Sequence, residues 1–161
     1  MLFTKKGDKG KSSTIDKKEI AKSSLVFVVV GTFDELNSWL GLAKLSISKS
    51  DKVLVERIQQ NILNFSAIVA GYKEGKYDWA DETKLLEDYI MLNNKYIQKS
   101  GFILPGKNQT SAQFHIARTV CRRGERTLSK YYYQNKTKKL ADIVTYVNRL
   151  SDFLYLLGLK Y

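Results

Sequence analysis

The chain has few of the residues from which disulfides, metal clusters and nucleophilic sites are built. Its 161 residues include one cysteine, Cys121, and one histidine, His115. A single cysteine excludes an internal disulfide and a cysteine-based zinc cluster, and a single histidine excludes a multi-histidine metal site. Cys121 falls on an apolar helical stripe, which favours a buried, inert thiol over a nucleophile. These counts predict a reducing, cytoplasmic setting.

Long hydrophobic runs are also missing. The longest uninterrupted apolar run, Leu25–Val30, covers six residues, whereas a membrane-spanning helix needs about 18 or more. The first residues lack the hydrophobic region of a signal peptide. We therefore expect one domain over residues 1–161, with room for a real core and no membrane association.

Acidic residues are scarce relative to basic ones, since 27 lysines and arginines face 16 aspartates and glutamates, a formal net charge of +11. Such a balance suits a nucleic-acid binder or a protein with a polyphosphate ligand. The lysines are scattered, however, and no recognised nucleic-acid motif accompanies them. We therefore favour a phosphate-bearing small molecule and expect no nucleic acid as partner.

Proline, which interrupts helices and strands, occurs only once, and this Pro105 predicts where one helix begins. The residue before a proline is pushed out of α geometry, so this helix should start after Pro105-Gly106. Apolar residues recur at helical spacing elsewhere, and the run Val28–Val30 is assigned to a helix because no partner strand is visible. Asp51 and Asp81 are the expected N-caps of two helices. The expected helices are 28–45, 52–72, 82–99, 109–134 and 137–159.

The fold class is therefore an all-α, five-helix bundle of residues 25–161, preceded by an irregular, glycine-containing segment of residues 1–24. That segment reads TKKGDKGKSS from Thr4 to Ser13. Its glycines allow backbone N–H groups to turn toward an anion, and its Thr, Lys and Ser side chains add donors. Taken alone, the segment could equally be a basic tail, and it lacks the P-loop spacing.

The helix over 109–134 carries two stripes. Phe114, Ala117, Cys121 and Leu128 form an apolar one. His115, Arg118, Arg122 and Glu125 follow i, i+3, i+7, i+10 spacing and share a face beside it. Guanidinium forks match phosphate oxygens well, although the same pattern occurs on solvated, salt-bridged helix faces.

Two further helices carry polar groups within apolar patterns. Asp34 and Asn37 are poor helix formers, and a carboxylate paired with an arginine of the 109–134 helix would explain Asp34. An exposed polar face is the alternative. Asn148 and Asp152 lie one turn apart in the last helix, where they could bind a ligand or hold Arg149 and the other arginines in place.

Four strings together resemble the PduO-type ATP:cob(I)alamin adenosyltransferase family. They are TKKGDKGKSS, GTFDELNSWLGLA, FILPG followed by HIARTVCRRGER, and VNRLSDFLYLL. They occur in family order and cover about residues 3–157. The resemblance implies a ferritin-like five-helix bundle that assembles as a homotrimer with active sites between subunits.

The resemblance also implies the reaction. Members transfer the 5′-deoxyadenosyl group of ATP to the cobalt of cob(I)alamin, formed from cob(II)alamin, and release triphosphate. Mg²⁺ accompanies ATP, no metal site belongs to the protein itself, and a reductase and an adenosylcobalamin-dependent enzyme are possible partners. A non-catalytic ATP and corrinoid carrier of the same fold is the alternative.

Residue roles carry over from the family onto matching positions. Arg122 should bind the phosphates, Arg118 should pair with Asp34 of the adjacent subunit, and Phe102 should lie beneath the corrin and keep the lower axial ligand off cobalt. Leu104 belongs to the same corrinoid loop. The expected ATP-binding residues are Thr4, Gly7, Asp8, Gly10, Lys11, Ser12, Ser13, Lys22, Arg122, Glu125, Arg126 and Asn148.

Several positions depart from the family pattern. Val26 stands where an arginine is usual, Lys107 replaces the second glycine of the common PGG, and Ser12 replaces a threonine. The chain stops at Tyr161 without the longer tail of many relatives. Val26 and Lys107 bear on phosphate affinity and on the shape of the corrinoid loop, respectively.

Overall fold

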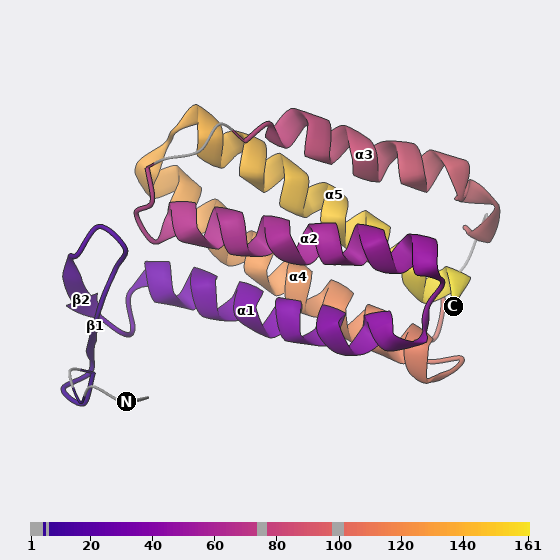
Figure 1. The fold of residues 1–161 in the computed structure, drawn as a ribbon, viewed down its shortest axis with the longest axis horizontal. Coiled ribbons are helices and arrows are strands. Elements are labelled where there is room, and N and C mark those ends of the chain that lie inside the picture. The colour runs from indigo at the N-terminus through magenta and orange to yellow at the C-terminus, as the bar shows by residue number, and fades with distance from the viewer. Residues whose placement is uncertain (1–4, 6, 74–76, 98–101) are drawn as a thin grey trace.

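The computed structural model describes residue 5 and residues 7–73, 77–97 and 102–161. In these residues the chain forms five α-helices and one short β-hairpin (Figure 1). Two 3₁₀ helices, Lys44–Ser46 and Asn94–Tyr96, follow the first and third α-helices. The all-α bundle expected from the sequence is confirmed. Its helices are α1 (Leu25–Ala43), α2 (Lys49–Val69), α3 (Trp79–Leu92), α4 (Gln109–Asn135) and α5 (Lys138–Lys160).

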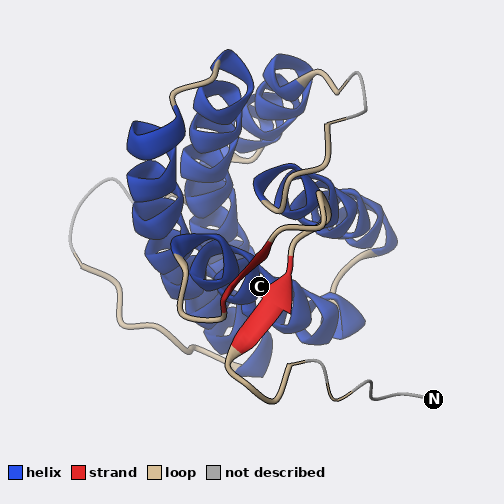
Figure 2. Ribbon diagram, turned by 90° about the vertical axis from the view of Figure 1, so that its left-hand side faces the viewer, coloured by secondary structure: helices blue, strands red, loops and turns tan. Residues whose placement is uncertain are grey.

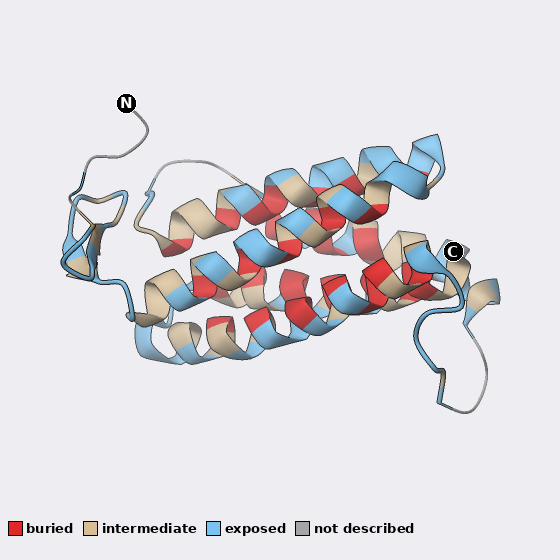
Figure 3. Cartoon of the chain, turned by 90° about the horizontal axis from the view of Figure 1, so that it is seen from below, coloured by how far each residue is buried: buried red, intermediate tan, exposed pale blue. Residues whose placement is uncertain are grey.

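Helix α4 lies at the centre of the arrangement. It packs against α1 on one side and α5 on the other, while α2 lies beside α1 and α3 beside α5. Consecutive helices run in opposite directions along the long axis (Figure 1). The helix faces turned toward one another are the buried ones (Figure 3). The expected apolar stripe of α4 is confirmed, since Phe114, Ala117, Cys121 and Leu128 are fully buried.

Two glycines allow α4 to approach its neighbours closely. A Cβ atom on Gly124 of α4 would lie 2.8 Å from the ring of Phe33 in α1, and one on Gly158 of α5 would lie 2.8 Å from the imidazole of His115 in α4. Any side chain at either position would therefore force the helices apart. Gly124, the glycine of the RRGER string, is thus required by the close packing of α4 against α1.

Helix α1 is unusually apolar. With the following 3₁₀ turn, Leu25–Ser46 has the length and mean hydropathy (1.3) of a membrane-spanning helix. Its stripe of Val29, Phe33, Leu36 and Leu40 is nevertheless fully buried within the bundle. We therefore interpret α1 as a core helix.

The structure corrects several of the sequence-based boundaries, including the start of α1, which is Leu25 and not residue 28. Residues 1–24 are not wholly irregular, because β1 (Lys11–Ser13) pairs antiparallel with β2 (Glu19–Ala21). Helix α2 begins earlier than predicted and is capped by Ser48, whose Oγ accepts from the Asp51 N–H at 3.2 Å. Asp78, not Asp81, caps α3. Helix α3 also ends at Leu92, and the last two residues predicted for it, 98–99, lie outside the described residues.

The hairpin stands at the end of the bundle where α1 begins (Figures 1 and 2). The Ile15 N–H, in its turn, donates to the Ala70 carbonyl at 2.9 Å, just beyond α2. Asp16 accepts from Thr14 and pairs with Lys18 within the turn. The hairpin is therefore fastened to the bundle through its turn.

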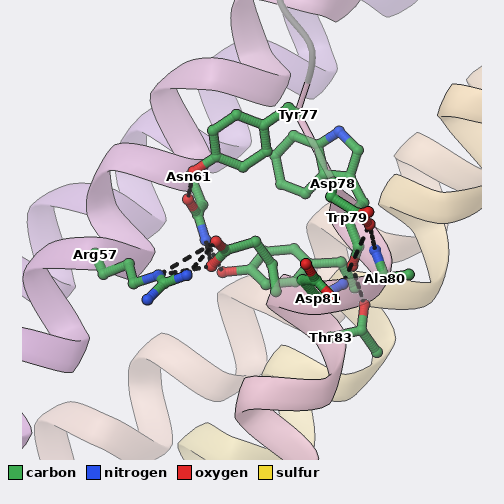
Figure 4. Close-up of polar contacts among 10 residues, drawn as sticks. Arg57, Asn61, Tyr77, Asp78, Trp79, Ala80, Asp81 and Thr83 are labelled. Atoms are coloured by element: carbon green, nitrogen blue, oxygen red, sulfur yellow. Dashed lines mark hydrogen bonds and ion pairs between the residues drawn. The ribbon is translucent and has the colours of Figure 1, made fainter.

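A buried polar network joins α2, α3 and α5 (Figure 4). Asn61, 1 % exposed, donates to Glu82 at 2.7 Å and to the Tyr146 hydroxyl at 3.1 Å, and accepts from Tyr77. Arg57 completes the network with a bidentate ion pair to Glu82. The buried carboxylate is thus fully satisfied, as a charge in a core must be.

We predict that Asn61→Ala lowers the free energy of unfolding by about 2–3 kcal/mol, because it leaves Glu82, Tyr146 and Tyr77 without a shared partner. Urea denaturation followed by circular dichroism measures the change. Gln60→Ala, on the exposed side of the same helix, should change the stability by less than about 0.5 kcal/mol. Equal effects of the two variants would contradict a stabilising role for the network.

Candidate functional site

The exposed face of α4 carries a basic groove. Arg122, Glu125 and Arg126 line it, and it continues along the helix to Ser129, Lys130, Tyr133 and Gln134, enclosing about 630 Å³. These positions follow one another at helical spacing, so the buried apolar stripe forces them outward. The groove thus brings together three residues predicted to contact ATP. An anion of phosphate character suits its two guanidinium groups.

Asn148 of α5 lies at the edge of this groove. Its Nδ2 donates to Glu125 Oε1 at 2.8 Å, which orients the carboxylate beside the arginines. Arg149 points elsewhere and pairs with Glu87 at 3.0 Å and Asp152 at 2.7 Å. Asp152 therefore holds Arg149 in place, as one of the two sequence interpretations proposed, and Asn148 stays available to a ligand.

Arg118 occupies the same row, nearer the start of α4. Its guanidinium carbon lies 5.8 Å from the centre of the Tyr155 ring, within cation–π range. Its Nε is buried and has no hydrogen-bond partner among the described residues. The Arg118 side chain is thus held against α5, and its Nε has no acceptor in the part of the chain that the structure describes.

His115 was expected on this polar row but is only 4 % exposed. It packs edge-on against Tyr155 and closely against Gly158. Burial lowers the pKa of His115, and the positive charges of Arg118 and Lys107 lower it further. The imidazole is thus a neutral packing group in the fold, and its Nδ1 has no hydrogen-bond partner among the described residues.

Asp34 lies exposed on α1, and the described residues show no ion pair for it within the chain. The pair that does join α1 to α4 connects Glu35 with Arg123. Within the described part of the chain, the arginine that reaches α1 from α4 thus meets Glu35, the residue next to Asp34. The Asp34 carboxylate is left for another partner.

The glycine-containing segment forms a second group with Lys22. The Lys22 N–H donates to the Gly10 carbonyl at 2.8 Å, and a Cβ on Gly7 would lie 2.9 Å from Lys22 Nζ. Gly10 has a φ of +72°, which favours glycine. Asp8, Lys11 and Ser13 are exposed, Ser12 is partly buried, and Thr4 lies outside the described residues.

Phe102 and Leu104 stand on the loop before α4 and are fully exposed and 91 % exposed, respectively. Such exposure of large apolar side chains is unusual unless something covers them. The loop is at the opposite end of the bundle from the hairpin (Figure 1). Since α4 has 27 residues, it places about 40 Å between these ends. One chain therefore does not bring the glycine-containing segment to Phe102.

The described residues hold no group of three or more His, Cys, Asp or Glu side chains that could bind a metal ion. The groove offers a divalent cation one carboxylate, Glu125, and neutral side-chain oxygens such as those of Ser129 and Gln134. That donor set fits a cation carried largely by ligand phosphates and water.

Sequence reasoning missed several residues of these surfaces. Lys130 and Tyr133 extend the basic groove, and the helical period that gave Arg122 and Arg126 also reaches them. Tyr155, which lies against Arg118, stands beside the leucine stripe of α5 and outside its apolar period. No local signal indicated that an aromatic ring there would face an arginine.

Comparison with protein families gives a match to the cobalamin adenosyltransferase family over residues 2–161. The corrinoid adenosyltransferase MMAB of Bos taurus is 34 % identical over 173 residues, which cover 98 % of this chain and 69 % of the relative. The corrinoid adenosyltransferase PduO of Salmonella typhimurium is 32 % identical over 164 residues. This match covers 98 % of the present chain but only 48 % of the Salmonella protein.

Solved structures show the same likeness. A variant of the PduO-type ATP:corrinoid adenosyltransferase from Lactobacillus reuteri, complexed with cobalamin and ATP, superimposes with a TM-score of 0.89 at 29 % identity. The match covers 98 % of this chain and 91 % of that one. Another variant from the same organism, complexed with ATP, gives a TM-score of 0.85 at 31 % identity.

The lowered pKa of His115 predicts a pH dependence of stability. Between the lowered value and about 6.5, the unfolded chain binds more protons than the folded one, so stability rises with pH and is lost as the pH falls through this window. Urea denaturation from pH 8 to pH 5 should show this slope in the wild type and not in His115→Gln. The lowered pKa of Asp51 acts at more acidic pH. An equal slope in both proteins would refute the assignment to His115.

Proposed function

The chain belongs to the cobalamin adenosyltransferase family, and we propose that it transfers the 5′-deoxyadenosyl group of ATP to the cobalt of cob(I)alamin. The products are adenosylcobalamin and triphosphate. The observation that carries the proposal is the guanidinium row of α4, which borders an open groove in a chain that matches the family model almost throughout.

The reaction requires little acid–base catalysis from the protein. The Co(I) electron pair attacks C5′ of the ribose, a Co–C bond forms, and the C5′–O bond breaks with its electrons going to the triphosphate. The nucleophile thus needs no general base, and the protein's tasks are positioning and charge neutralisation. The polar groups of the basic groove suit those tasks.

Phosphate binding falls to two groups of residues. Arg122 and Arg126 offer guanidinium forks from α4, with Glu125 and Asn148 beside them. The segment from Thr4 to Ser13, together with Lys22, would wrap the triphosphate, which makes residues 1–24 the nucleotide-binding part of a single domain over residues 1–161. Mg²⁺ would neutralise the phosphate oxygens further.

Corrinoid binding falls to the loop before α4. Phe102 would cover the lower face of the corrin and exclude the axial ligand, which makes reduction of cob(II)alamin to cob(I)alamin easier. The exposure of Phe102 and Leu104 supports this role, because an apolar ligand surface would bury them. Phe102 acts by excluding a ligand and takes no part in proton transfer.

An assembly of several chains, which we propose to be a homotrimer, would complete the site. The glycine-containing segment and Phe102 are at opposite ends of each chain, so two subunits are needed to bring them to one substrate pair. Among the described residues, no hydrogen-bond partner is found for Arg118 Nε, and Asp34 is exposed. A pair across the interface between the Asp34 carboxylate and the end of the Arg118 guanidinium would give each charge a partner.

One departure from the family pattern, Val26 in place of an arginine, bears on phosphate binding. Val26 packs against the apolar core, so phosphate binding would depend on Lys22 and the α4 arginines. We further propose a cytoplasmic location, where a reductase would supply cob(I)alamin and an adenosylcobalamin-dependent enzyme would use the product.

Arg122→Ala should lower kcat/KM by about 30- to 1,000-fold, the loss of about 2–4 kcal/mol of transition-state stabilisation from one charged donor. The measurement is the spectral change from cob(I)alamin to adenosylcobalamin after Mg·ATP is added. Arg122→Lys should keep part of the activity, because the charge remains without the fork. Lys52→Ala, exposed on α2, serves as the control. Unchanged activity in Arg122→Ala, or ATP binding by the wild type without product, would overturn the proposal.

Asp34→Arg alone and Arg118→Asp alone should each weaken the assembly by placing like charges at the interface. The double variant Asp34→Arg/Arg118→Asp should restore much of it by reversing the pair. Sedimentation velocity measures the oligomer and the adenosylation assay measures its site. Single variants that remain trimeric and fully active would rule out this ion pair as an interface contact.

A further inference from the structure

Hydrogen bonds join the start of α4 to the end of α5. Lys107 Nζ donates to the Leu159 carbonyl at 2.6 Å, and Ser111 Oγ donates to the Gly158 carbonyl at 2.6 Å. Asn108 Nδ2 donates to the main-chain oxygen of Tyr161, while its Oδ1 caps α4 by accepting from the Ser111 N–H. The last carbonyls of a helix lack intrahelical partners. Three side chains at the start of α4 supply the missing donors.

The end of α5 is itself rigidly held. Asp51 of α2, 2 % exposed, accepts from Lys160 at 2.6 Å, from the Tyr89 hydroxyl at 2.7 Å and from the Tyr161 hydroxyl. Burial would raise the pKa of Asp51, but these three donors lower it below its ordinary value. The carboxylate therefore stays charged and fixes the last residues of α5 to α2 and α3. Lys107 therefore binds to the end of α5, which is itself held in place by the Asp51 network.

The loop just before Lys107 has little else to hold it. Phe102, Leu104, Pro105 and Gly106 are exposed and Ile103 is partly buried, and no backbone hydrogen bond of residues 102–107 appears among the described residues. Gly106 has a φ of +97° and approaches only Ala112. The position of the loop is therefore set mainly by the contact at its carboxyl end.

We propose that Lys107 is a positioning residue that fixes the Phe102–Gly106 loop against the end of α5 and so sets the geometry of corrinoid binding. The ammonium group carries a positive charge to the negative end of the α5 macrodipole, which strengthens the contact. Lys107 touches neither reacting atom. The inference rests on the proposed function, because it takes Phe102 as the residue beneath the corrin.

The test compares Lys107→Met, which keeps the aliphatic stem without the donor, with Lys107→Arg, which keeps a charged donor. The loss of a charged hydrogen bond predicts that Lys107→Met raises the KM for cob(I)alamin about 5- to 10-fold, while the KM for ATP stays within about twofold. It should also lower the four-coordinate share of bound cob(II)alamin in its absorption spectrum. Lys107→Arg should restore both. Lys49→Met, exposed at the first residue of α2 and at the same end of the bundle, is the control.

Equal changes in both KM values, or an unaltered corrinoid KM with an unaltered spectrum, would overturn the positioning role. A second readout separates this failure from failure of the proposed function. A nitroxide spin label on Leu104→Cys reports loop motion without any substrate, and the native Cys121 is fully buried with a raised pKa, so it does not compete for the label. The label should be more mobile with Lys107→Met than with Lys107. Identical line shapes would refute the inference even in an active enzyme.

Discussion

The close packing of α4 between α1 and α5 governs the rest of the structure. Gly124 admits the Phe33 ring on one side, and Gly158 admits the His115 imidazole on the other. Because both neighbouring helices lie so close, the apolar stripe of α4 is fully buried, and this fixes the rotation of α4 about its own axis. The arginines that follow at the remaining helical positions then have only the exposed face available. The basic groove is thus a consequence of how the core packs.

The length of α4 decides how the functional groups are distributed. The helix separates the glycine-containing segment at one end from Phe102 at the other, with the guanidinium row between them. A reaction that joins a nucleotide to a corrinoid needs both ends at one place. Under the proposed function, one chain would supply only part of each site and a second subunit the rest. Arg118 Nε, which has no partner among the described residues, and the exposed carboxylate of Asp34 fit that proposal.

Among the residues that the structure describes, the buried acidic side chains are two well-satisfied carboxylates, Glu82 and Asp51. Glu82 is held by Arg57 and Asn61, and Asp51 by Lys160 and two tyrosine hydroxyls. The first network ties α2, α3 and α5 together in the interior, whereas the second secures the end of α5. Because Lys107 depends on that end, a contact far from the groove bears on the loop that carries Phe102.

The sequence by itself determined what depends on local periodicity: five helices, the buried stripes, the guanidinium row and the family to which its four strings point. Tertiary contacts decided the remainder. Strands of three residues depend on pairing with each other, so the hairpin left no local signal. The burial of His115 against Gly158 and the contact between Lys107 and Leu159 join residues more than 40 positions apart. Spacing along a helix predicts which residues share its face, but only the packing of helices decides what that face meets.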